Sequence, residues 1–187
     1  YNVTEAFTDA PIVSSMEVVE IGRTEDGVPV FIDQNASRAD WIVVAGRIKP
    51  HTKFKAPIES GLMKMMAIGM EKQKGAEYYH KAAIQYGFAK IIVDAGREVI
   101  RKAPVLCGIG IVENGYDETA ILEAIRPGEM ETRERELLAV AKEMMPRLPF
   151  NEIDLLIVDE MGKNISGTGI DPNVTGRNRD ILGVFPT

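Results

Sequence analysis

The chain has 187 residues, of which 45% are hydrophobic and 27% are charged, close to ordinary globular usage. A chain of this length can bury a substantial core without disulfide or metal staples, which excludes disorder, collagen-like repeats and coiled coils as its main description. Acidic residues outnumber basic ones by 28 to 22 and the net charge is −6, so the chain lacks the basic field on which nucleic-acid binding depends. No apolar run approaches the roughly 18 residues of a membrane span, and we expect neither a nucleic-acid nor a membrane partner.

The single cysteine indicates the cellular compartment, and the first residue indicates whether the sequence is a fragment. Cys107 is the only cysteine, so no internal disulfide can form and a reducing, cytoplasmic compartment is expected. Residue 1 is a tyrosine, and no initiator methionine or signal-like stretch precedes the first structured segment. We therefore expect a piece of a longer protein, with the missing N- and C-terminal segments among its partners.

The first quarter of the chain predicts a hairpin and a strand. Met16–Ile21 and Val28–Ile32 are β-prone stretches separated by a Glu-Asp-Gly turn at residues 25–27. Trp41–Ala45 is a continuous apolar run of strand length, which is typical of a buried strand.

Three helices are predicted next. A methionine-rich helix covers Gly61–Met70, and a second covers Ala76–Tyr86 and is interrupted by Gly87. A third follows and is closed by Pro104. The apolar stripe of the first helix consists of Leu62, Met65, Met66 and Met70, and that of the third of Phe88, Ile91, Ile92, Ala95, Val99 and Ile100.

The second half of the chain predicts two strands and two helices. Leu106–Val112 is an apolar strand in which Gly108 and Gly110 indicate close backbone approach. Asp117 is expected to cap a short helix over Glu118–Ile125. A longer helix covers Met130–Met145 and stops at Pro146, and Ile153–Val158 is expected to be a last central strand.

This alternation of strands and helices predicts an α/β fold, with a layered, mainly parallel sheet flanked by helices. We divide the chain into residues 1–105, an α/β portion of a larger N-terminal domain, and residues 106–187, a second α/β portion that is part of a C-terminal domain. In such folds ligands gather at the carboxyl ends of the strands. Two loops there are candidates for the site: residues 46–64, after the strand Trp41–Ala45, and residues 159–177, after Ile153–Val158.

The first loop leads to the only two histidines and a lysine. His51 follows Pro50 in the loop, where an imidazole can act as an acid or base near neutral pH. His80 lies on a predicted helix, where a neutral ring nitrogen can bind a metal. The alternative is that His51 only hydrogen-bonds the backbone and that His80 sits on a solvated helix face. Lys64 lies within the methionine-rich helix, where desolvation would make it a nucleophile, unless its side chain reaches water from one face.

The second loop combines glycines with hydroxyl, amide and cationic side chains. Lys163, Asn164 and Arg177 are suited to an anionic ligand such as a carboxylate or a phosphate. The P-loop spacing is absent, and the acidic residues of the loop match no calcium-loop spacing. The alternative for this stretch is a surface connection between domains.

The residues Gly46, Ile48, Pro50 and His51, followed by Lys64 and His80, resemble the motif of the nickel-pincer lactate racemase family. The resemblance covers Trp41–His80. It implies that His51 is a general acid/base, that Lys64 carries a nickel-pincer nucleotide through a covalent link, and that His80 coordinates the nickel. The other catalytic histidine of that family lies in an upstream segment.

The resemblance implies a racemase or epimerase of a small 2-hydroxy acid. Hydride would pass from the α-carbon to the cofactor and return to the opposite face, with Lys163, Asn164 or Arg177 holding the substrate carboxylate. Two other readings stay open: a non-catalytic ligand-binding paralogue of the same fold without the cofactor, and an iron–sulfur-associated protein whose cluster cysteines lie outside this piece.

Overall fold

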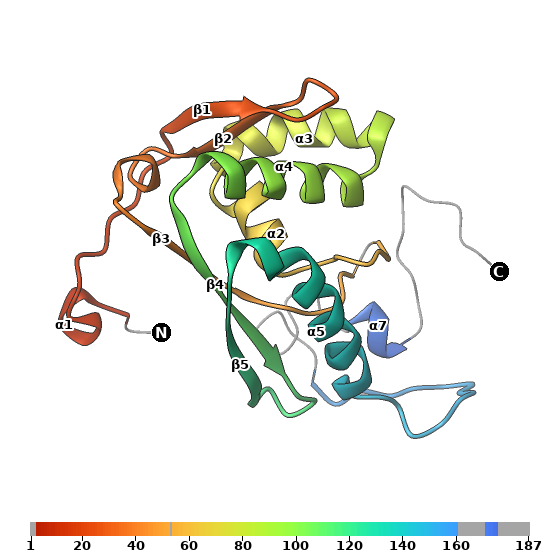
Figure 1. Cartoon of the computed structure of the whole chain (residues 1–187). Helices are drawn as coiled ribbons and strands as arrows, with labels where there is room; N and C mark the ends of the chain where they lie inside the picture. Colours follow the sequence, from red (N-terminus) through yellow and green to blue (C-terminus); the bar gives the residue numbers. More distant parts are fainter. Residues whose placement is uncertain (1–2, 53, 161–170, 176–187) are drawn as a thin grey trace.

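The computed structural model describes residues 3–52, 54–160 and 171–175 (Figure 1). After a short helix α1 (Glu5–Thr8), the strands β1 (Val18–Arg23) and β2 (Pro29–Asp33) pair antiparallel. Gly27 supplies the positive φ of +79° that the connecting turn requires. The predicted hairpin is confirmed.

The central sheet has the strand order β3-β4-β5. Strand β3 (Ile42–Arg47) runs parallel to β4 (Val105–Glu113), and β4 runs antiparallel to β5 (Thr119–Ile125). The α/β class and the flanking helices are confirmed, and the sheet is mixed. The division of the chain at residue 105 stays a prediction.

Strand β5 replaces the short helix that we expected over Glu118–Ile125, so that prediction is wrong. Asp117 does not cap a helix: it lies in the β4–β5 turn with φ of +59°. The Asn114 side chain closes this turn, because its Oδ1 accepts the N–H groups of Tyr116 (2.9 Å) and Glu118 (3.1 Å). The turn directs the following residues back along β4, where backbone pairing outweighs their weak helical pattern.

Strand β3 is buried on one face only, which differs from the buried strand expected from its continuous apolar run. Ile42 and Val44 are buried, whereas Val43 is 53% exposed. The reason is that the described helices cover one face of the sheet: α2 contacts β3 and β4, and α5 contacts β4. The opposite face stays open in the described part of the chain, and Leu122 on β5 is 67% exposed.

The helices follow the predicted order. Helix α2 (Leu62–Lys64) continues into a π-helical turn η2 (Met65–Gly69), and α3 (Lys72–Tyr86) and α4 (Phe88–Lys102) follow. Gly87, with φ of +81°, makes the break between α3 and α4. Helix α5 (Met130–Met144) ends before Pro146, as predicted. The remaining short elements are η1 (Ala36–Arg38), η3 (Pro127–Glu129) and α7 (Pro172–Thr175).

The stripe predicted for the methionine-rich segment is only partly correct. Leu62 and Met66 are buried, but Met65 is exposed and Met63 takes a core position. A π turn needs more residues per turn than an α-helix, so the segment does not keep one regular face.

Residues 153–158, predicted as a central strand, form an irregular and exposed segment, so that prediction is wrong. Leu155 is 76% exposed and Ile157 is 79% exposed. An apolar run becomes a strand only when a neighbouring strand accepts its backbone hydrogen bonds. Among the described strands, none pairs with this segment.

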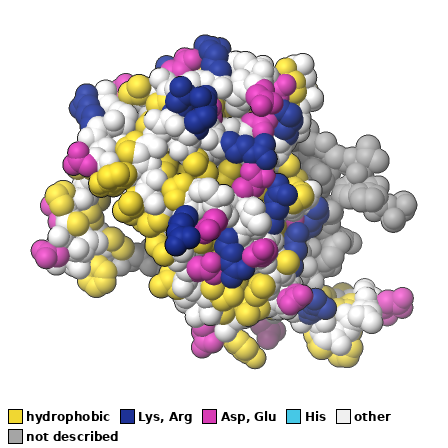
Figure 2. Space-filling model, viewed as in Figure 1, with side chains coloured by type: hydrophobic (Ala, Val, Ile, Leu, Met, Phe, Trp, Pro, Cys, Tyr) yellow, Lys and Arg dark blue, Asp and Glu magenta, His cyan; other side chains and the backbone are white. Residues whose placement is uncertain are grey.

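The core lies between the sheet and the helices, and glycines on β4 allow their close approach. A Cβ on Gly108 would lie 2.6 Å from Leu62 Cδ1, and a Cβ on Gly110 would lie 3.0 Å from Ile48 Cδ1. The outer surface mixes basic and acidic side chains (Figure 2). The Arg97–Glu131 ion pair (2.7 Å) links α4 to α5. None of the helices described is long and apolar enough to cross a bilayer.

Candidate functional site

The candidate site is built on residues 49–60, which we call the site loop, between β3 and α2. The Lys49 N–H donates to the Ser60 carbonyl at 2.9 Å, and the two residues form an isolated antiparallel bridge. This bridge closes the neck of the loop. The loop therefore leaves and returns at one point, between the end of the parallel strand and the start of the helix that carries Lys64.

A buried carboxylate fixes the interior of the site loop. Glu59 has no exposed surface, and its Oε2 accepts the His51 N–H at 2.7 Å. Its Oε1 accepts the Ala56 N–H at 3.2 Å and lies 2.7 Å from Lys142 Nζ of helix α5. A buried carboxylate is tolerated when it is paired and hydrogen-bonded in this way. The backbone at His51 is therefore held from inside the loop.

An aromatic row links the two histidines. The ring of His51 stacks on Phe54 with centroids 4.3 Å apart, and Phe54 stacks on Phe88 at 6.3 Å. His80 on α3 meets Phe88 edge-on at 5.2 Å. The Gly87 break makes this possible, because it places the first residue of α4 beside α3. The structure thus brings His51 and His80 to the same row, and His80 is exposed.

Lys64 contacts the neck of the site loop rather than the aromatic row. Its side chain is half-buried, and its Nζ lies 3.5 Å from Ser60 Oγ. Burial lowers the pKa of Lys64 below the ordinary lysine value of 10.5, and the nearby charge of Lys49 lowers it further. This amine is therefore more often neutral, and more nucleophilic, than a solvated lysine. The π turn begins at the next residue, and such turns often occur at functional sites.

A second buried carboxylate holds the turn that carries Lys64. Glu134 of α5 has no exposed surface, and its Oε2 accepts the Met63 N–H at 2.9 Å. Burial raises the pKa of Glu134 to about 7, although the N–H groups of Met63 and Leu62 draw it back down. The approach is close, because a Cβ on Gly61 would lie 2.5 Å from Glu134 Oε1. Gly61 at the N-terminus of α2 has no capping side chain, so Glu134 takes that part.

The sequence analysis missed both buried carboxylates. A signal existed for Glu134, since it falls three and four residues before Leu137 and Leu138 on the buried stripe of α5. A charged residue on such a stripe indicates a buried partner. No comparable signal marks Glu59, whose partner Lys142 lies 83 residues away.

The second candidate loop lies largely outside the described residues, and this includes Lys163, Asn164 and Arg177. A described neighbour, Asn173 in α7, does reach the site loop: its Nδ2 donates to the His51 carbonyl at 3.4 Å. Lys55 Nζ donates to Asn173 Oδ1 as well. The two candidate loops are therefore in contact, at His51.

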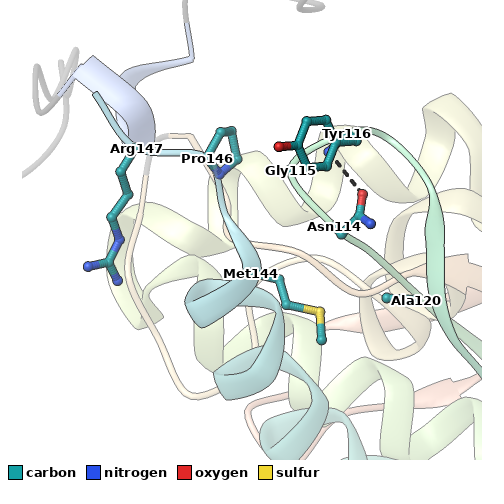
Figure 3. A pocket seen from close by; sticks show the side chains of 7 residues that line it. All are labelled: Asn114, Gly115, Tyr116, Ala120, Met144, Pro146 and Arg147. Carbon is teal, nitrogen blue, oxygen red and sulfur yellow. Dashed lines mark hydrogen bonds between the residues drawn. The ribbon is translucent and has the colours of Figure 1, made fainter. Parts of the chain in front are cut away.

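We also searched the described residues for a metal-binding cluster and for a cavity. The described residues contain no group of three or more His, Cys, Asp or Glu side chains that could hold a metal ion. An open recess of about 560 Å³ lies between the β4–β5 turn, at Asn114 and Tyr116, and the end of α5 at Met144 with Arg147 just after it. Figure 3 shows the side chains that line this recess. Of the predicted site residues, the three that the structure describes (His51, Lys64 and His80) do not line it.

Comparison with known proteins identifies the part of the chain that carries the site. Residues 5–89 match the family model of the lactate racemase N-terminal domain. A search of curated proteins found no match to the chain. The matched segment contains His51, Lys64 and His80, whereas Glu134 and Lys142 lie beyond it. The resemblance to the lactate racemase family that the motif indicated is therefore confirmed over residues 5–89, which match that N-terminal domain.

Proposed function

We propose that this chain is the cofactor-bearing part of a racemase or epimerase of 2-hydroxy acids that uses a nickel-pincer nucleotide. One observation carries the proposal. A single loop, pinned at its neck and by Glu59, sets His51 in a row of rings with His80 and starts the turn that presents Lys64. These three residues belong to the family motif, and they lie within the matched segment.

Lys64 is the proposed attachment point of the cofactor. A covalent bond to an amine requires the neutral form, and burial with the nearby Lys49 charge lowers the pKa of Lys64 in that direction. Ser60 Oγ, 3.5 Å from Lys64 Nζ, gives the amine a polar neighbour that carries no negative charge and so does not stabilise the protonated form. No carboxylate pairs with Lys64 among the described contacts, so nothing there holds it in the charged form.

His80 is the proposed nickel ligand. A pincer group brings several donors of its own, so the protein needs to add few, and the lack of a described cluster of three donors does not conflict with this role. His80 is exposed and touches Phe88 edge-on, which leaves its ring free to face a bound group beside the row. When bound, the nickel-pincer group would supply the site that accepts hydride from the α-carbon.

His51 is the proposed acid/base. Its role would be to take the proton from the substrate hydroxyl and to return it, an assistance worth about 10²–10⁴-fold in rate. The ring stacks on Phe54 and its backbone N–H is held by Glu59, so the position of the imidazole is defined from two sides.

The substrate carboxylate would be held by Lys163, Asn164 or Arg177. Arginine binds a carboxylate through two parallel hydrogen bonds, which suits a small acid. The contact between Asn173 and His51 supports this assignment, because it ties the neighbouring part of that loop to the site loop.

Peptide mass spectrometry of Lys64 tests the proposal. The full-length protein would be purified from its native host with nickel supplied, and the peptide around Lys64 compared with that around Lys81, an exposed lysine on α3. The proposal predicts a heavy adduct on Lys64, none on Lys81, and none in the Lys64→Arg variant. Unmodified Lys64 at full occupancy would refute it and favour the ligand-binding paralogue.

A further inference from the structure

We infer that helix α5, which lies beyond the matched segment, is built into the site: Glu134 positions Lys64, and Lys142 positions His51 through Glu59. The inference rests on the proposed function for the roles of Lys64 and His51. It adds two positioning residues that the family match over residues 5–89 does not contain.

The first contact is the one from Glu134. This fully buried carboxylate accepts the Met63 N–H at 2.9 Å, one residue before Lys64. The α2 helix has only three residues and no capping side chain of its own, so its first turn depends on a partner from elsewhere. Gly61 lies against the same carboxylate, which leaves no room for the turn to shift toward α5.

The second contact comes from the same helix, two turns further on. Lys142 Nζ lies 2.7 Å from Glu59 Oε1, and the other oxygen of Glu59 accepts the His51 N–H. The residues between Glu134 and Lys142 include Leu137, Leu138 and Ala141, all buried in the core. The helix is thus a rigid spacer, and its two contacts fix the separation between the Lys64 turn and the His51 loop.

One oxygen of Glu134 supports a positioning role over a purely structural one. Its Oε1 is buried and has no hydrogen-bond partner among the residues that the structure describes, although buried polar atoms are normally paired. A core position serving stability alone would be better filled by an apolar side chain. The Glu134 carboxylate faces the N–H groups of Leu62 and Met63, and both residues belong to the turn that presents Lys64.

The test of the first contact measures the reactivity of Lys64 in the cofactor-free protein. Lys64 would be acylated over a range of pH and quantified by mass spectrometry in the wild type, Glu134→Leu, Glu134→Gln and Glu131→Leu. Glu131 is the matched control, since it lies on α5 but pairs with Arg97 at the surface.

We expect the pH midpoint of Lys64 labelling to rise in Glu134→Leu, because the loosened turn exposes the amine, and its rate at pH 8 to fall severalfold. Glu134→Gln keeps an acceptor for the Met63 N–H and should restore much of the wild-type profile. A lower melting temperature with an unchanged Lys64 midpoint would overturn the inference.

Two further measurements keep the test decisive if Glu134→Leu does not fold. Amide exchange of residues 62–64 in the wild type should be slow, and rapid exchange there would overturn the inference without any variant. Lys142→Met should alter the rate of hydrogen exchange at the His51 imidazole C2, whereas Lys102→Met at the exposed end of α4 should not. None of these measurements needs the cofactor. A missing adduct on Lys64 would therefore refute the proposed function without deciding whether Glu134 and Lys142 are positioning residues.

Discussion

His80 and Phe88 meet edge to face, with ring centroids 5.2 Å apart, across the break between α3 and α4. Such contacts favour one orientation of a ring over others, because the positive edge of one ring faces the negative face of the other. Phe88 is also the residue on which Phe54 of the site loop stacks. One aromatic side chain therefore connects the proposed metal ligand to the loop that carries the proposed acid/base.

Replacing Phe88 should weaken nickel binding while leaving the fold intact. In Phe88→Leu this partly buried position stays apolar, but His80 and Phe54 both lose their ring partner. We expect the nickel content of the purified full-length protein to fall severalfold, measured as metal per chain. Phe150→Leu, at an exposed aromatic residue outside the row, is the control, and equal loss of nickel in both variants would contradict the assigned role.

Gly61→Ala should destabilise the protein through Glu134. The new Cβ would lie 2.5 Å from Glu134 Oε1 and 3.0 Å from Ile48 Cγ1, so the buried carboxylate or the backbone must move. Overpacking of this kind costs about 1–3 kcal/mol in the free energy of unfolding. Urea unfolding would measure it. Gly128→Ala is the control, because no heavy atom lies within 4 Å of its added Cβ, and a similar loss there would remove the steric explanation.

The stability of the fold should depend on pH through Glu134. Burial raises the pKa of Glu134 from 4.5 to about 7, so the folded state holds its proton more tightly than the unfolded chain. The stability that this contributes is complete below pH 4.5 and is lost as the pH rises through 7, by about 3 kcal/mol in total.

Urea unfolding of the wild type and Glu134→Gln between pH 4.5 and 8 would check this prediction. The difference in stability between the two proteins should change in favour of the variant as the pH rises, because the amide cannot ionise. Glu136→Gln, which removes a surface partner of Arg133, should show no such trend. A difference between wild type and Glu134→Gln that is flat with pH would contradict the assignment.

Tyr79→Phe should destabilise the base of the helix that carries His80. The Tyr79 hydroxyl donates to Glu71, both side chains are fully buried, and burial raises the pKa of Glu71 to about 9. Loss of the hydroxyl leaves the carboxyl group without that donor, at a cost of about 1–3 kcal/mol. Thermal unfolding would measure this loss of stability, with Tyr78→Phe as the control because the Tyr78 ring is partly exposed. Equal losses in the two variants would show that the buried Tyr79–Glu71 hydrogen bond does not stabilise the fold.

Much of the fold was predictable because it follows local patterns. The β1–β2 hairpin was marked by its turn, and α4 and α5 by long apolar stripes ending at proline. The errors fall where the outcome depends on distant partners. Strand β5 is set by pairing with β4, and residues 153–158 have the composition of a strand but no described neighbour to pair with.

The candidate site also has a part that could be predicted from local sequence and a part that could not. His51, Lys64 and His80 could be selected from their spacing and their resemblance to a family. Their surroundings could not, because the groups that hold them come from far along the chain. Glu134 acts on Met63 across 71 residues, and Lys142 acts on Glu59 across 83. Sequence periodicity indicates that a position is buried, but it does not indicate which backbone N–H group will donate a hydrogen bond to the side chain there.

The most direct test of the proposed hydride transfer follows deuterium at C2. The nickel-loaded full-length protein would be given a panel of enantiopure 2-hydroxy acids, each deuterated at C2. We expect at least one acid to racemise with its deuterium retained at C2, and Lys64→Arg to abolish the reaction. Racemisation with solvent hydrogen at C2, or undiminished turnover by Lys64→Arg, would contradict it.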